Sequence, residues 1–205
     1  MCRFFGLLAA GFLLVLPAWA DDKKDPPPKD NPSAKEPATA REKYQAMLKD
    51  YNTQHGKLAA EINKAKGEER QKLAQKSTAM SKDFAEKFYK LAEDDPKSLV
   101  ATDALFWVAQ NGNGSPAFSK AMEKVADLAA EIPLPGLVNR LRQFRGGNAQ
   151  LFEAVVNRAD KDAKEPQAAE LLVWVAERGS ALPIGQEAAN QVIERYPAHA
   201  AVTQL

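Results

Sequence analysis

The chain has 205 residues, of which 28 are Lys or Arg, 27 are Asp or Glu, and 45% are hydrophobic. This length allows one or two ordinary domains, and the near-neutral charge excludes the overall basic field of a dedicated nucleic-acid-binding protein. Arg41–Lys90 holds 12 basic residues against 7 acidic ones, whereas the chain from Leu91 onward holds 11 against 15. We interpret this unevenness as a solvated helix face, with a binding patch as the alternative.

The amino terminus has the pattern of a secretory signal peptide. One basic residue precedes an apolar run of 13 residues, Phe4–Leu16, which is too short to cross a bilayer of roughly 30 Å as a helix. Small residues follow at Ala18 and Ala20, the positions that a signal peptidase reads. We predict a signal peptide over residues 1–20 and a mature chain that begins at Asp21. An uncleaved anchor or a buried core helix is the alternative.

Cleavage at this site removes Cys2, the only cysteine of the chain. The mature chain then has no disulfide, no thiolate metal ligand, and no cysteine nucleophile or redox pair. An exported protein can do without disulfides when its core is large enough. We therefore expect an exported protein, periplasmic or extracellular, with no stable membrane anchor after cleavage.

Residues 21–38 have the composition of a linker. The segment is rich in Pro, Lys and Asp and lacks aromatic and large aliphatic residues. Such a segment cannot bury enough apolar surface to offset the entropy lost on ordering. We predict a disordered spacer, although a proline-rich ligand motif is the alternative.

A helical hairpin is predicted from about Thr39 to Glu93. Gly67 separates two stretches of helical periodicity, and the second is predicted to break near Ser77–Ser81. We expect His55 to be a core or boundary residue, because no second ligand residue accompanies it at a metal-binding spacing. The apolar positions of the first helix are spaced four and three residues apart: Tyr44, Leu48, Tyr51, His55, Leu58, Ile62 and Ala65.

The second half of the chain contains an internal repeat. LFWVAQNG at 105–112 returns as LVWVAERG at 172–179, and an offset of 67 residues aligns residues 84–130 with 151–197 without a gap. Thirteen of these 47 positions are identical, and in both copies a glycine ends one helix and a proline begins the next. This pattern predicts two related units in which stacked helices share a continuous core.

Each unit is predicted to contain three helices, and no segment alternates as a strand does. The fold class is therefore all-α: a helical hairpin followed by two related three-helix units, resembling an α-solenoid, over residues 39–205. The predicted helices are Ser81–Glu93, Lys97–Asn111 and Pro116–Glu131, a short helix Leu137–Phe144 between the units, and then Ala149–Ala159, Pro166–Arg178 and Gly185–Tyr196.

Trp107 and Trp174 are the candidate interaction residues. They occupy matching positions of the repeat and could stack on a glycan or peptide, although their place on or beside the apolar stripes favours core packing. GNGSPA, at 112–117, matches a dinucleotide-binding pattern only formally, because a helix and not a strand is predicted before it. We interpret this segment as a helix end followed by a new helix start.

No catalytic, cofactor-binding or metal-binding residue is predicted. The carboxylate pairs Asp94-Asp95 and Asp160-Asp162 fall in predicted turns, where capping and solvation are expected rather than glycosidase chemistry. His199 has no recognisable partner, and the sequence has no H-E-x-x-H motif, nucleophile elbow or P-loop.

The segments FAEKFYKLAEDDPKSLVATDALFWVAQN, SPAFSKAMEKVADLA and AAELLVWVAERG resemble a helical region of exported bacterial thioredoxin-like proteins. In that family the region follows a signal peptide and precedes a redoxin domain that carries the thiol–disulfide site. The resemblance covers about Ala40 to Pro197, but this sequence has no C-x-x-C and no redoxin strand pattern. The resemblance implies a stand-alone or truncated copy of the helical module.

These observations predict an exported, non-enzymatic helical-repeat module for protein–protein interaction or scaffolding in the cell envelope. The expected partner is a protein, with no nucleic acid, cofactor or metal. The alternatives are the helical accessory part of a split or truncated thioredoxin-like redox protein, and a hydrolase with an unrecognised carboxylate site.

Overall fold

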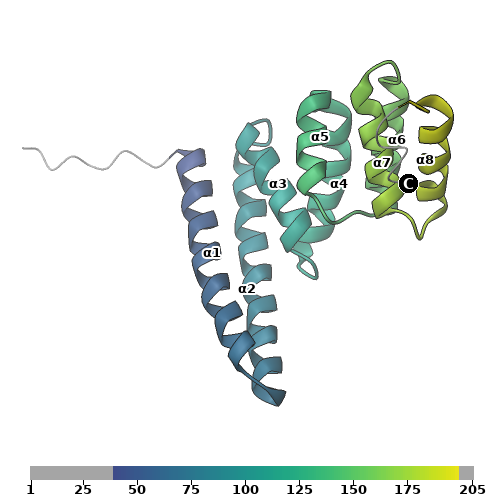
Figure 1. Cartoon of the computed structure of the whole chain (residues 1–205). Coiled ribbons are helices and arrows are strands. Elements are labelled where there is room, and N and C mark those ends of the chain that lie inside the picture. Colours follow the sequence, from purple (N-terminus) through teal and green to yellow (C-terminus); the bar gives the residue numbers. More distant parts are fainter. Residues whose placement is uncertain (1–38, 199–205) are drawn as a thin grey trace, which may run out of the picture. The chain divides into compact units, whose positions relative to one another are not determined.

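A computed structural model describes residues 39–198, and within this range the chain forms eight helices and no strand (Figure 1). The predicted all-α class is confirmed. The predicted signal peptide with Ala18, Ala20 and Asp21, the linker, and His199 lie outside the described residues. The helices are α1 (Ala40–Lys64), α2 (Gly67–Asp94), α3 (Leu99–Asn111), α4 (Pro116–Glu131), α5 (Leu134–Gln143), α6 (Ala149–Lys161), α7 (Pro166–Arg178) and α8 (Pro183–Arg195).

Helices α1 and α2 pack against each other as the predicted hairpin (Figure 1). Gly67 begins α2 with a φ of 56°, a left-handed conformation that glycine adopts without steric cost. The predicted break near Ser77–Ser81 is wrong, because α2 is continuous to Asp94. The hydroxyl of Thr78 donates to the carbonyl of Ala74, and Ser81 lies 3.4 Å from the Tyr51 hydroxyl. The helix thus accommodates these hydroxyl groups instead of ending at them.

Few residues of α1 are buried, because the end of the hairpin around the α1–α2 turn extends beyond the helix that packs on it. Helix α1 has 25 residues and α3, which packs across the hairpin, has only 13. At 1.5 Å per residue, these are lengths of about 37 and about 20 Å. Only Tyr51 and Leu58 of α1 are therefore buried, and His55 is exposed, with its ring stacked on Tyr51 at a centroid distance of 5.4 Å. His55 is not a core residue.

Two groups of three helices follow the predicted 67-residue offset: α2–α3–α4, which we call the first triplet, and α6–α7–α8, the second triplet. Helices α3 and α7 each have 13 residues, and their bounds, 99–111 and 166–178, differ by 67 at both ends. Helix α3 packs on α2 and α4 as α7 packs on α6 and α8. At the ends of α3 and α7, the amides of Gly112 and Gly179 donate to Val108 and Val175 at the same distance, 2.7 Å. These correspondences agree with two related units, which remain a prediction.

The core lies around α3 and α7. Each of these helices has eight buried residues, so each is enclosed on most sides by its neighbours. Helix α4 packs on α6, and α5 packs on α7, which joins the two triplets. The largest fully buried side chains are Phe88, Phe144, Met122, Leu137, Leu141, Leu151, Leu171 and Leu172.

The predicted interpretation of GNGSPA as a helix end and a helix start is confirmed. Gly112 ends α3, and the Ser115 hydroxyl accepts a hydrogen bond from the Phe118 amide at 3.2 Å, with Pro116 at the start of α4. The next amide, of Ala117, donates to the Glu86 carboxylate at 3.0 Å. Since α3 precedes this turn, the structural context of a dinucleotide-binding loop is absent from this segment.

Replacing Ser115 with alanine is expected to lower the free energy of unfolding by about 1 kcal/mol, because the Phe118 amide loses its cap. Ser115 is 6% exposed, so water cannot readily take the place of the hydroxyl. Urea unfolding monitored by circular dichroism measures the change. The exposed Ser119 of α4 gives the matched control, Ser119→Ala, which should leave stability within about 0.5 kcal/mol of wild type.

Candidate functional site

The two predicted tryptophans lie in the middle of α3 and α7 and are buried, with 9% of Trp107 and 7% of Trp174 exposed. The Trp107 ring lies 4.2 Å from Phe88 and 4.8 Å from Tyr51, between ring centroids. Trp174 packs on Phe152 at 5.5 Å. This burial favours packing over an exposed stacking platform.

The indole N–H groups of the two tryptophans have different surroundings. Trp174 Nε1 donates to the Phe144 carbonyl at 3.3 Å, whereas Trp107 Nε1 has no acceptor among residues 39–198. Trp107 Nε1 is not among the enclosed side-chain atoms without a partner in this range, where only Gln191 Oε1 is of that kind. Helix α5 ends just before Phe144, so the Phe144 carbonyl is available to accept from Trp174. Helix α1, which packs near Trp107, is unbroken, and its carbonyls are used within the helix.

Trp107 lines a cavity of about 250 Å³ that we name the α3 groove. Helix α1 contributes one wall, α5 and the residue after it contribute the other, and α3 forms the base. Among the lining residues, only Trp107 was singled out from the sequence. The α3 groove is lined by Tyr44, Asp103, Phe106, Trp107, Gln110, Asn111, Arg140, Gln143 and Phe144.

The floor of the α3 groove is aromatic. Phe106 is 8% exposed and meets Phe144 edge-on at 5.8 Å, and Tyr44 meets Phe88 edge-on at 5.4 Å. Burial, and after it the negative charge of Asp103, raises the pKa of the Tyr44 hydroxyl. The phenol therefore stays protonated at neutral pH and can donate a hydrogen bond.

Ion pairs of Asp103 connect the elements that line the α3 groove. The Asp103 carboxylate accepts from Arg41 and from Arg140, at 2.6 Å in each case, and the Arg140 guanidinium lies 5.4 Å from the centre of the Phe106 ring. Asp103 and Arg140 are partly buried, with 22% and 27% of their side chains exposed. Within the lining, Asp103 and Arg140 balance each other, and Arg41, which lies outside the lining and is 55% exposed, adds one positive charge beside them.

The lining of the α3 groove offers mainly hydrogen-bonding groups and aromatic surface. Its lining contains no Ser, Cys, Lys or His, and its one carboxylate, Asp103, forms ion pairs with Arg41 and Arg140. Its polar groups are the Trp107 N–H, the Tyr44 hydroxyl, the Arg140 guanidinium, the Asp103 carboxylate and the side-chain amides of Gln110, Asn111 and Gln143, most of which can donate hydrogen bonds. A ligand that offers acceptors to these donors and an apolar group to the aromatic floor would fit the lining.

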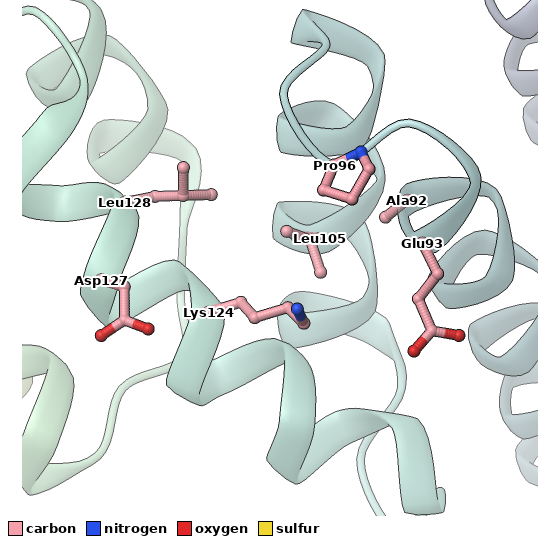
Figure 2. Close-up of a pocket in the computed structure, with 7 residues that line it drawn as sticks. All are labelled: Ala92, Glu93, Pro96, Leu105, Lys124, Asp127 and Leu128. Atoms are coloured by element: carbon pink, nitrogen blue, oxygen red, sulfur yellow. The ribbon is translucent and has the colours of Figure 1, made fainter.

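A second cavity of about 140 Å³ lies among α2, α3 and α4 (Figure 2). Leu105, 4% exposed, lies among the charged side chains of Glu93, Lys124 and Asp127. Both carboxylates are exposed, whereas the general acid of a glycosidase needs a sheltered carboxyl group whose pKa is raised. This cavity supplies less for recognition than the α3 groove, which has both aromatic rings and the ion pairs of Asp103.

The carboxylates predicted to lie in turns are at helix ends. Asp95 and Asp162 follow α2 and α6 directly, but Asp94 and Asp160 lie within those helices, so the prediction is wrong for these two. Helix α6 continues to Lys161, so Asp160 lies in its last turn. Asp160 forms an ion pair with Arg195 of α8, and Asp162, just after α6, forms one with Arg158 of α6. No group of three His, Cys, Asp or Glu residues that could hold a metal ion occurs in residues 39–198.

Comparison with protein-family models, with curated proteins and with solved structures finds no match. The resemblance to the helical region of exported thioredoxin-like proteins therefore stays a prediction. Among the described helices, none is both long enough and apolar enough to span a membrane.

Proposed function

We propose that this protein is an exported helical module that binds a protein partner through the α3 groove. The observation that carries the proposal is the lining of the groove: four aromatic rings beside the Asp103–Arg140 pair and exposed amide side chains. Tyr, Trp, Phe and Arg are the residues enriched at protein interfaces. A hollow with these residues, and with the Trp107 N–H that has no acceptor among residues 39–198, favours a binding role.

The rigidity of the groove supports the same role. Its base belongs to α3, which is enclosed by neighbouring helices, and its two walls are joined across the base by the ion pairs of Asp103 with Arg41 and Arg140. A binding surface that is already ordered loses less conformational entropy when the partner docks. Export is proposed from the signal-peptide pattern of residues 1–20, and it would place the partner in the periplasm or outside the cell.

A photoreactive benzoyl-phenylalanine at Gln110, exposed on the rim of the α3 groove, tests the proposal in the producing cells. We expect one adduct of defined mass, identified by mass spectrometry, whose purified protein component binds the full chain saturably. The matched control carries the same group at Glu187, exposed on α8, and should give no such adduct. Absence of an adduct at Gln110, or the same adducts from both positions, would contradict the proposal.

A further inference from the structure

We infer that the α3 groove recognises an extended acidic peptide segment, whose backbone carbonyl accepts a hydrogen bond from Trp107 Nε1. This inference rests on the proposed function and adds the chemistry of the partner. Its grounds are the Trp107 indole, which has no acceptor among residues 39–198, the two arginines Arg41 and Arg140 that share the single carboxylate Asp103, and the aromatic lining.

The chain itself contains a related interaction in the second triplet. Trp174 corresponds to Trp107 under the 67-residue offset, and its Nε1 donates to the carbonyl of Phe144. Phe144 begins the non-helical segment 144–148, has extended backbone angles, and lies with its ring 6.4 Å from that of Trp174. An extended segment therefore satisfies this indole, and the continuous α1 supplies no equivalent carbonyl to Trp107. A peptide of a partner can supply it.

The charge along the groove selects an acidic segment. Residues 132–152, which include α5, contain Arg140, Arg142 and Arg145 and no Asp or Glu. Arg142 pairs with Glu170, and Arg140 shares Asp103 with Arg41, so the one carboxylate in the groove lining is already doubly paired. A second carboxylate, brought by a ligand, could pair with Arg41 or Arg140, which now share Asp103, whereas a basic ligand would meet two arginines with no free carboxylate in the lining.

The shape of the groove favours a peptide over an anionic membrane surface. A hollow of about 250 Å³ is lined by residues of α1, α3 and α5, and four of the lining residues are aromatic. An apolar side chain next to the acidic residue can enter this hollow, but a planar layer of lipid headgroups meets only the rim. The inferred segment therefore combines an Asp or Glu with a neighbouring aromatic or large aliphatic residue.

Random dodecapeptides displayed on phage, selected on the immobilised full chain, test this inference. We expect the selected peptides to be rich in Asp and Glu beside aromatic residues. A synthetic copy of one of them should bind about threefold more weakly to the Gln110→Glu chain and about threefold more tightly to Gln110→Lys, because Gln110 is an exposed rim position. Trp107→Phe, which keeps an aromatic ring but removes the donor, should weaken binding about tenfold.

The same charge changes at Gln186, exposed on α8, form the matched control and should leave the dissociation constant unchanged. Selected peptides without an acidic excess that still compete with the Gln110 adduct would overturn the acidic assignment while the proposed function stands. Failure to select any peptide, together with no adduct at Gln110, would overturn both. Binding to phosphatidylglycerol vesicles with the same dependence on Gln110 would assign the surface to lipid and overturn the peptide inference.

Discussion

Trp107→Ala and Trp174→Ala are each expected to lower the free energy of unfolding by about 3–5 kcal/mol, the usual cost of removing a large aromatic side chain from a closed core. Both side chains are more than nine-tenths buried and lie at matching positions of α3 and α7. A loss of this size is a large part of the stability of an ordinary domain. Thermal and urea unfolding of the two variants measure it.

The phenylalanine variants separate ring packing from hydrogen bonding at these two positions. Trp174→Phe removes a buried hydrogen bond to the Phe144 carbonyl and should cost about 1 kcal/mol more than Trp107→Phe, since Trp107 has no acceptor in the described part of the chain. If both alanine variants instead melt at nearly the wild-type temperature, the tryptophans belong to a working surface and not to the core.

Gly185→Ala is expected to lower the free energy of unfolding by about 1–3 kcal/mol, because a methyl group overfills a tightly packed site. A Cβ atom at Gly185 would lie 2.2 Å from the Gly179 carbonyl oxygen and 2.8 Å from the Ser180 amide nitrogen. These are backbone atoms, so no side-chain rotation relieves the overlap, and the start of α8 must move away from the end of α7. Urea unfolding of the variant measures the loss.

Gly56→Ala is the matched control, because Gly56 lies within α1 and a Cβ there would meet nothing within 4 Å. Alanine favours the helix over glycine by roughly 0.8–1.0 kcal/mol, so this variant should be more stable than wild type. The same gain in helix propensity opposes the clash at Gly185. Equal stabilisation by both substitutions would show that α8 does not approach the α7–α8 turn as closely as described.

Local signals in the sequence were sufficient for several helix bounds. The predicted ranges Pro116–Glu131 and Pro166–Arg178 are those of α4 and α7. A proline at the first helical position and a glycine at the end of a helix act through their own backbone geometry, which depends little on distant residues. The predicted start of α8 at Gly185 is two residues late, although Pro183 carries the same signal.

The α3 groove could not be predicted as a site, because its parts are far apart in the sequence. Arg41 and Arg140 are 62 and 37 residues from Asp103 in the sequence. The composition of a single segment therefore does not predict that these three side chains are in contact. One signal was present in the repeat: Asp103 and Glu170 are acidic at matching positions, and each pairs with an arginine of α5. Without the packing of α5 near α3, that match has no meaning.

The periodicity and the repeated phrase were enough to predict that Trp107 and Trp174 occupy similar positions, since a side chain's place on a helix follows from its spacing. Their different hydrogen bonding depends on which backbone lies opposite each indole. Helix α5 ends at Gln143 and presents the Phe144 carbonyl to Trp174, but α1 uses its carbonyls within the helix as it passes Trp107. His55 is a similar case. Its spacing places it beside Tyr51 on the same face of α1, but α3 is too short to cover that part of α1, so His55 is exposed.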